Sequence, residues 1–294
     1  MTDIDKRYLN IPETLKDDRR FALVQEGEGA LHHVVAPVCA LYAKPEDRAD
    51  VDTQLIVGED FVVYQEEADW AFGIAPRDHY VGWVRKSHLK EGASNATHHV
   101  VYHGTFIYSK ADLKSRPVMK IPMGARLTTK GEEETRGTIY NKVENGWVVK
   151  GHLRPTDYFF SDFVSVGETT IGMTYLWAGR SPFGIDCSGL VQLCMQMAGI
   201  AVLRDSDMQE ATIGEDIPLD DELSGLQRGD LIYWPGHCGM MRDEKTLLHA
   251  NGHTMTVASE PLAEAVERIA YLYEKPRAVR RPALLGVGEP GQSV

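Results

Sequence analysis

An internal repeat in the first half of the chain limits its fold more than any other feature. Residues 82–89 (GWVRKSHL) recur as residues 146–153 (GWVVKGHL), 64 positions later. Upstream, residues 42–44 (YAK) match residues 108–110 (YSK) at a spacing of 66. Because loops vary in length more than the elements they join, two nearly equal spacings predict two copies of one small structural unit.

Each copy has the pattern of a small β-structure, with short apolar runs separated by glycine, proline and aspartate. The strand-like runs are 54–57, 61–64 and 80–84 in the first copy, and 126–129 and 138–140 in the second. About 60 residues organised in this way predict a small barrel. The Gly-Trp-Val stretch of each copy resembles the closing strand of bacterial SH3-like domains. This resemblance places a first SH3-like domain at residues 31–92 and a second at 97–156, after a polar lead-in at residues 1–30.

Composition narrows the range of partners. The chain has 294 residues, with 31 Lys and Arg against 43 Asp and Glu, so its formal net charge is −12. An acidic chain without a basic stripe repels phosphate backbones, so we expect no nucleic-acid partner. Its apolar runs fall short of the ~18–20 residues that a membrane helix needs, so we expect no membrane partner. The sequence does not indicate an oligomeric state.

The first residues give an expectation about location. Residues 1–7 (MTDIDKR) lack the charged-then-apolar pattern of a signal peptide, and their acidic residues argue against a transit peptide. If the native chain starts here, we expect a cytoplasmic protein, although removal of a signal peptide would leave the same pattern.

The cysteines are irregularly spaced, at Cys39, Cys187, Cys194 and Cys238. This spacing fits neither a disulfide framework nor a paired zinc motif, so we expect no metal site. A helix is predicted from Cys187 to about Ala198, with Gly199 as its stop. Cys194 falls on the apolar face of that helix, and we interpret it as a core residue.

Cys187 is the candidate nucleophile. It lies in FGIDCSGLV (183–191), at the start of the predicted helix and after a glycine-containing turn. Free backbone N–H groups and the helix dipole favour a thiolate there. The same N–H groups can hold an oxyanion. Structural cysteines also occur at helix starts, so the assignment requires a base.

His237 is the candidate base, and His249 its orienting partner. A hairpin centred near Asp243 places positions 237 and 249 opposite each other on one face, with Cβ atoms ~4.5–5.5 Å apart. His237 then takes the thiol proton and His249 orients it. Cys238 follows His237 on the strand, so we expect it to point to the opposite face.

At this point several motifs occur in one order: Tyr175-x-Trp177, Asp186-Cys187-Ser188-Gly189, residues 204–209 (RDSDMQ), Gly229-Asp-Leu231, His237-x-Gly239 and His249-Ala250. With these motifs, residues of about 160–275 resemble the NlpC family of bacterial cell-wall cysteine peptidases, which have a papain-like fold. Together with the two SH3-like domains, the chain resembles the γ-D-glutamyl-L-diamino acid peptidases that process peptidoglycan peptides.

The resemblance implies a set of site residues. The catalytic triad falls on Cys187, His237 and His249, and no cofactor is required. The residues implied to line the pocket around the scissile bond are Tyr175, Asp186, Ser188 and Ser206. In the first SH3-like domain, Tyr80 is the candidate residue for recognising the substrate's free amine. Asp50 is the candidate acidic partner of that amine, and Glu59 is a weaker choice for the same role.

Two positions depart from the family pattern, and four have ordinary structural interpretations. Ala178 replaces a common glycine, and Cys238 replaces a usual β-branched residue; neither change touches the triad. We interpret Trp83 and Trp147 as barrel core, and Arg180 and Arg204 as surface residues.

The resulting expectation is an α+β protein, with two small SH3-like β-barrels followed by a papain-like cysteine peptidase domain at residues 160–294. The expected reaction is hydrolysis of the γ-D-Glu–diamino acid bond in peptidoglycan-derived peptides (L-Ala-γ-D-Glu-diamino acid), in murein peptide recycling. Two alternatives stay open: another amidase or acyltransferase activity of the same fold, and a cell-wall-peptide binding module with an inactive last domain. The preference for meso-diaminopimelate or lysine is also open.

Overall fold

The computed structural model describes residue 20 and residues 29–220, 222–272 and 274–283. The expected lead-in at residues 1–30 therefore lies almost entirely outside the described residues. The chain divides into two compact units. Among the described residues, the N-terminal unit ends at Tyr158 and the C-terminal unit begins at Phe159. No helix in the described ranges is long and apolar enough to span a membrane.

The first repeat of the N-terminal unit forms one antiparallel sheet in the order β3-β2-β6-β5-β4-β1-β7. Its strands are β1 (Ala30–Val34), β2 (Val38–Tyr42), β3 (Val51–Ile56), β4 (Asp60–Glu67), β5 (Trp70–Ala75), β6 (Tyr80–Arg85) and β7 (Leu89–Glu91). Alternation sets the core: in β4, Phe61 and Val63 are buried, whereas the residues between and beyond them are more exposed. A short 3-10 helix, Lys86–His88, joins β6 to β7.

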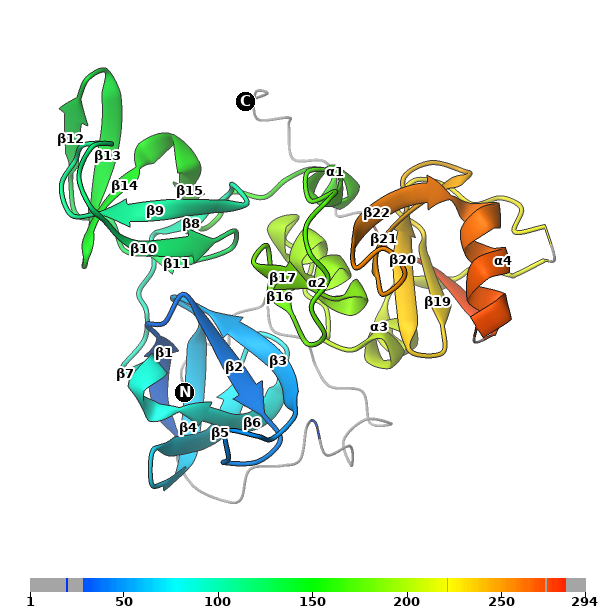
Figure 1. The fold of residues 1–294 in the computed structure, drawn as a ribbon, viewed down its shortest axis with the longest axis horizontal. Helices are drawn as coiled ribbons and strands as arrows, with labels where there is room; N and C mark the ends of the chain where they lie inside the picture. The colour runs from blue at the N-terminus through cyan, green and yellow to red at the C-terminus, as the bar shows by residue number, and fades with distance from the viewer. Residues whose placement is uncertain (1–19, 21–28, 221, 273, 284–294) are drawn as a thin grey trace. The chain divides into compact units, whose positions relative to one another are not determined.

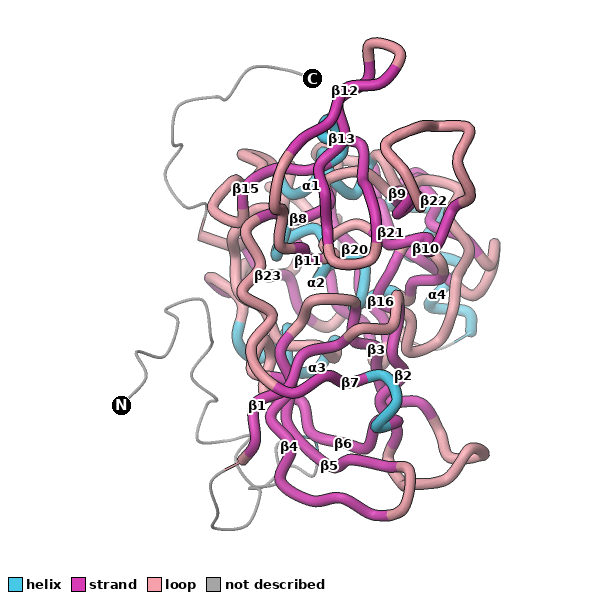
Figure 2. The backbone as a smooth tube through the Cα atoms, turned by 90° about the vertical axis from the view of Figure 1, so that its left-hand side faces the viewer, coloured by secondary structure: helices cyan, strands magenta, loops and turns pink. Residues whose placement is uncertain are grey.

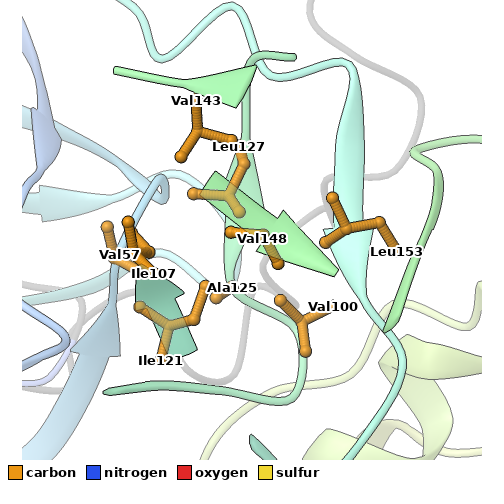
Figure 3. Close-up of a cluster of buried hydrophobic side chains, with 9 residues drawn as sticks. All are labelled: Val57, Val100, Ile107, Ile121, Ala125, Leu127, Val143, Val148 and Leu153. Carbon is orange, nitrogen blue, oxygen red and sulfur yellow. The ribbon is translucent and has the colours of Figure 1, made fainter. Parts of the chain in front are cut away.

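The second repeat forms two sheets, β10-β9-β14-β13-β12 and β11-β8-β15. Its strands are β8 (His98–Val100), β9 (Gly104–Tyr108), β10 (Pro117–Pro122), β11 (Arg126–Leu127), β12 (Glu132–Thr135), β13 (Thr138–Val143), β14 (Gly146–Val149) and β15 (Leu153–Pro155). Figure 3 shows the buried cluster between these strands. Val57 of the first repeat packs into this cluster beside Ile107 and Ile121 of the second, so the two repeats share part of their core.

The two repeats pair their strands in the same way. Tyr42 is the partner of Trp83, and Tyr108 is the partner of Trp147. The glycine before each Trp allows this close approach: a Cβ on Gly146 would lie 2.2 Å from the Tyr108 carbonyl oxygen. The internal repeat is thus a repeat of structure. The pairings of the described strands close no barrel, so the two barrels stay a prediction.

The interpretation of Trp83 and Trp147 as core residues is wrong. Both rings are only half-buried, whereas the next residue in each strand, Val84 or Val148, is fully buried. Because neighbouring side chains alternate between the two faces, the valines take the inward face and the tryptophans cover the outside. Lys142 lies 5.0 Å above the Trp147 ring.

The C-terminal unit is built on an antiparallel sheet in the order β18-β23-β19-β20-β21-β22. Its elements are α1 (Phe163–Glu168), β16 (Arg180–Ser181), β17 (Gly184–Ile185), α2 (Cys187–Met197), α3 (Ser206–Thr212), β18 (Glu215–Asp216), β19 (Leu231–Trp234), β20 (His237–Met241), β21 (Thr246–Asn251), β22 (Thr256–Pro261), α4 (Leu262–Leu272) and β23 (Ala278–Arg281). Strands predominate over helices in the chain (Figure 2).

Helices α2 and α4 cover opposite faces of this sheet (Figure 1). On β21, Leu247 packs in a buried cluster with Leu262 of α4. Leu248 points the other way, where a Cβ on Gly167 of α1 would lie 2.9 Å from Leu248 and 3.2 Å from the Cys194 sulfur of α2. Helix α2 is therefore held between the sheet and α1, and the prediction that Cys194 is a core residue is confirmed.

Candidate active site

Cys187 is the first residue of α2, and the residues around it explain why the helix begins there. The side chain of Asp186 caps the helix by accepting the backbone N–H of Gly189 at 2.7 Å. A Cβ on Gly189 would lie 2.3 Å from the Gly179 carbonyl oxygen, so glycine permits the preceding loop to pack closely. The buried thiol therefore lies at a helix start with unpaired backbone N–H groups.

The guanidinium of Arg204 binds the residues that cap helix α2. It donates to Asp186 Oδ2 at 2.7 Å, to Ser188 Oγ at 2.8 Å and to the Gly179 carbonyl at 3.2 Å. Burial raises the pKa of Asp186, and the charge of Arg204 opposes that rise. Arg204 is 1% exposed, so its interpretation as a surface residue is wrong: a buried carboxylate requires a buried cation.

Arg180 is buried as well, again contrary to expectation. It is 2% exposed and donates to Gln192 Oε1 and to Gln196 Oε1, both at 2.6 Å. These contacts fasten β16 to the middle of α2. Helix α2 is buried almost all round, so its two glutamines are the polar partners that a buried arginine needs.

The two histidines meet as predicted, although not in the predicted register. Nε2 of His237 lies 2.8 Å from Nδ1 of His249. Met240 pairs with Leu248, which centres the hairpin one residue later than expected and brings His249 opposite Gly239 instead of His237. A displacement by two positions keeps both rings on one face of the sheet, so they meet diagonally.

Gly239 makes room for this diagonal contact. A Cβ at this position would lie 2.8 Å from Leu247 Cδ1 and 3.0 Å from His249 Cβ. Any side chain at position 239 would therefore displace the strand that carries His249.

Cys238 points to the face opposite His237, as alternation predicts, but this face is the one that α2 covers, so Cys238 lies beside the nucleophile. The pKa of the Cys187 thiol is lowered well below its ordinary value, and the first cause is a hydrogen bond with the Cys238 thiol. Burial opposes this effect, whereas the charge and the hydrogen bond of His237 lower the pKa further. Burial raises the pKa of Cys238, which keeps it a protonated donor. Neighbouring side chains of β20 thus alternate between the two faces. Cys238 faces α2, and His237, at the beginning of the strand, contacts the thiol of Cys187.

Gln209 of α3 fixes the position of Cys238. Its Oε1 lies 3.8 Å from the Cys238 sulfur, and its Nε2 donates to the Ser188 carbonyl at 3.0 Å. Gln209 is fully buried. One side chain therefore links the second thiol to the backbone next to the nucleophile.

Of the remaining predicted pocket residues of this unit, Asp186, Ser188 and Tyr175 lie close to Cys187 in the chain or in space. Asp186 and Ser188 flank it. Burial raises the pKa of the half-buried Tyr175, and the charges of Cys187 and Asp186 raise it further. Ser206 is the first residue of α3.

Tyr80 and Asp50 belong to the N-terminal unit, and their proposed role in substrate recognition stays a prediction. Tyr80 is 2% exposed on β6, and its backbone N–H donates to Asp78 at 3.3 Å. Asp50 is exposed just before β3. Glu59 is 6% exposed and forms an ion pair with Arg77.

Glu260 is a neighbour of the site that the sequence patterns missed. Its Oε1 lies 2.6 Å from Nε2 of His249, and Arg268 of α4 contacts the same carboxylate. His249 pairs with Ala258 across β21 and β22, so Glu260 is two positions further along the same face. Alternation along β22 would have identified it, had the pairing of that strand been known.

A thiol of lowered pKa at a helix start, beside two hydrogen-bonded imidazoles, is the arrangement of a cysteine-type hydrolase. Comparison with known families supports this class. Residues 172–272 match the NlpC/P60 family, and residues 41–89 match the bacterial dipeptidyl-peptidase SH3 domain. The chain thus contains an NlpC/P60 domain and an SH3-like domain, and it is a cysteine-type peptidase.

Similarity to individual proteins extends over most of the chain. Dipeptidyl-peptidase 6 of Lysinibacillus sphaericus is 23% identical over 239 residues, which cover 74% of this chain and 86% of that protein. The γ-D-glutamyl-L-lysine dipeptidyl-peptidase of Bacillus subtilis (strain 168) is 27% identical over 255 residues, 79% of this chain and 81% of that protein. The crystal structure of an NlpC/P60 family protein from Bacillus cereus ATCC 10987 has a TM-score of 0.70 at 20% identity, covering 86% of this chain and 99% of that one. This last likeness shows the fold.

Proposed function

We propose that the protein hydrolyses the γ-D-Glu–diamino acid bond of peptidoglycan-derived peptides that carry a free N-terminal L-Ala. The observation that carries the proposal is the Cys187 thiol of lowered pKa beside the His237–His249 pair. The substrate class is supported by the relative from Bacillus subtilis, whose name is γ-D-glutamyl-L-lysine dipeptidyl-peptidase.

In the proposed mechanism, Cys187, His237 and His249 form the catalytic triad. The Cys187 thiolate attacks the γ-carbonyl carbon of D-Glu, and backbone N–H groups at the start of α2 hold the oxyanion. Protonated His237 gives its proton to the leaving amine of the diamino acid, and a thioester to L-Ala-γ-D-Glu remains. Water, deprotonated by His237, then hydrolyses the thioester.

The substrate pocket in this proposal is lined by Tyr175, Asp186, Ser188 and Ser206, and Tyr80 with Asp50 reads the free amine. The support is their place in the motifs that resemble the family, and the closeness of the first three to Cys187. We also infer that the second repeat is a further SH3-like domain, because it repeats the Tyr–Trp strand pairing of the first.

Mass spectrometry of cleavage products tests the substrate. L-Ala-γ-D-Glu-meso-diaminopimelate, the matching lysine tripeptide and their N-acetylated forms are each incubated with wild type and with Cys187→Ala. We expect cleavage of the free peptides by wild type alone. Cleavage of the acetylated peptides would overturn the role of the free amine. No cleavage of any peptide would favour another amide substrate or a binding module.

The proposed role is the recycling of cell-wall fragments, because an enzyme that requires a free N-terminal L-Ala acts on peptides already released from the glycan strand. Intact sacculi and released peptides compared at equal peptide concentration test this role. Release of diamino acid from sacculi at the rate seen for free peptides would contradict it.

A further inference from the structure

The orienting histidine of the site is itself held by a partly buried ion pair. His249 Nε2 lies 2.6 Å from Glu260 Oε1, and Arg268 Nη1 donates to Glu260 Oε2 at 2.6 Å while its Nη2 contacts Oε1. Glu260 lies near the end of β22, the edge strand of the sheet, and Arg268 lies eight residues later on α4. The side chains of His237, His249, Glu260 and Arg268 therefore form one continuous line of contacts. It ends on α4, which covers the face of the sheet opposite to α2.

The proton on each ring nitrogen follows from this chain. Although burial acts to raise it, hydrogen bonds with His249 and Arg268 hold the pKa of Glu260 at about 2, so its carboxylate only accepts. Nε2 of His249 must then carry a proton. Burial lowers the pKa of His249, so the ring is neutral and its Nδ1 is bare.

The protonation of His249 also determines which ring nitrogen of His237 carries a proton. A bare Nδ1 on His249 accepts a hydrogen bond, so Nε2 of His237, 2.8 Å away, must donate it. A neutral His237 then has its lone pair on Nδ1, the only ring nitrogen left to take a proton from the Cys187 thiol. The carboxylate thus decides, through two rings, which nitrogen of the base is free.

Asn251 does not compete for this role. Its Nδ2 lies 3.3 Å from His249 Nε2, further than Glu260, and its Oδ1 accepts the backbone N–H groups of His253 at 3.0 Å and Thr254 at 2.8 Å. These two bonds fix the amide with its donor side toward His249. A donor cannot pair with a protonated Nε2.

We propose that Glu260, clamped by Arg268, is a positioning residue that sets the tautomers of His249 and His237 for the proposed hydrolysis. The inference rests on the proposed function for its purpose, but not for its test. Loss of carboxylates that orient a metal-bound histidine typically lowers activity about 10–100-fold, and we expect a loss of similar size for this metal-free pair. The charged or titratable groups acting on His249 are His237, Glu260 and Arg268.

The test uses two readouts that need no peptide. Long-range proton–nitrogen spectra of histidine-labelled protein report the protonation of each ring nitrogen, and iodoacetamide alkylation across pH reports the reactivity of Cys187. In wild type we expect a protonated Nε2 and bare Nδ1 on His249. In the isosteric Glu260→Gln we expect mixed tautomers and alkylation at neutral pH slowed about 10–100-fold. Glu260→Asp should recover part of the rate.

A matched control lies on the same helix as Arg268. Glu267→Gln removes an exposed carboxylate of α4 and should change neither readout. Arg268→Gln, which keeps Glu260 but removes its clamp, is a second variant in case Glu260→Gln does not fold. The proposal is overturned if folded Glu260→Gln shows the tautomers and the alkylation rate of wild type. If only Arg268→Gln folds, the same result in that variant overturns it. If wild type shows the expected tautomers but cleaves no γ-glutamyl peptide, the proposed substrate fails and the positioning role stands.

Discussion

A hydrogen bond between the thiols of Cys238 and Cys187 is the first cause of the lowered pKa of Cys187, and Cys238 lies on the strand that also carries His237. The nucleophile therefore has two partners on neighbouring residues of β20. In the proposed mechanism His237 exchanges a proton with it, and Cys238 stabilises its negative charge. The departure of this chain from the usual β-branched residue at position 238 thus bears on the reactivity of the thiol.

Replacement of Cys238 by valine should make Cys187 less acidic. Valine has a similar volume but no donor, and a hydrogen bond to a charged group contributes about 1.5–3 kcal/mol, so alkylation at neutral pH should slow by about tenfold or more. Cys238→Ser keeps a donor and should recover most of the rate. The measurement is the pH dependence of iodoacetamide alkylation, followed by mass spectrometry of the peptide that contains Cys187.

Cys194→Ala is the matched control for this experiment. Cys194 is equally buried in α2, and burial raises the pKa of its thiol, so it takes no part in the site. The same alkylation profile in Cys238→Val and Cys194→Ala would show that the second thiol does not tune the first.

Gly239→Ala should lower kcat without changing the fold. The added Cβ would lie 2.8 Å from Leu247 Cδ1 and 3.0 Å from His249 Cβ, so the Leu247 side chain must move and His249 must shift by a few tenths of an ångström, which disturbs its 2.8 Å contact with His237. Overpacking of this kind costs about 1–3 kcal/mol of stability. Gly252→Ala is the control, since nothing lies within 4 Å of a Cβ there. Equal kcat and equal unfolding temperatures in the two variants would refute the role of Gly239.

The sequence predicted those parts of the site that depend on local pattern. Cys187 begins α2, and His237 and His249 meet on one face of a hairpin, because helix starts and strand alternation are properties of short segments. The register was displaced because the Arg242–Thr246 turn is centred one residue later than the charged residues suggested. The displacement did not separate the rings, because alternation in a strand has a period of two.

Residues that depend on the packing of distant segments were missed or misread. The contact of Cys238 with Cys187 was missed because the side of the sheet that α2 covers is not encoded in β20. Arg204 was read as a surface residue because its burial depends on a carboxylate 18 positions earlier in the chain. Glu260 had no motif of its own, since its partner lies on the neighbouring strand.

Arg204→Met should be among the most destabilising substitutions in the C-terminal unit. It leaves Asp186 buried without its cation, and breaking a buried pair costs about 3–5 kcal/mol. Urea unfolding followed by circular dichroism measures the loss. Arg277→Met is the control, because Arg277 forms a more exposed pair with Glu210 and its loss should cost at most about 1 kcal/mol. A loss for Arg204→Met as small as that of the control would contradict a structural role for the buried pair.

The ion pairs of Glu168 should make stability depend on pH in acid. The hydrogen bond from Arg228, with a further one from Arg242 and against the effect of burial, holds the pKa of Glu168 at about 2, below its ordinary value of 4.5. A carboxyl group with a depressed pKa stabilises the folded state above its unfolded pKa, and this contribution is lost as the pH falls through the folded pKa. The window for Glu168 therefore runs from about pH 4.5 down to about pH 2.

Glu168→Gln isolates this contribution from that of other acidic groups. At pH 6 the variant should be about 1–2 kcal/mol less stable than wild type, allowing for the solvent screening of partly exposed partners. The difference in the free energy of unfolding should shrink steadily below pH 4.5 and vanish near pH 2, while Glu260 titrates equally in both proteins and cancels. Urea titrations at several pH values give the difference directly. A difference that stays constant from pH 6 to pH 2 would mean that the pairs of Glu168 with Arg228 and Arg242 do not depress its pKa.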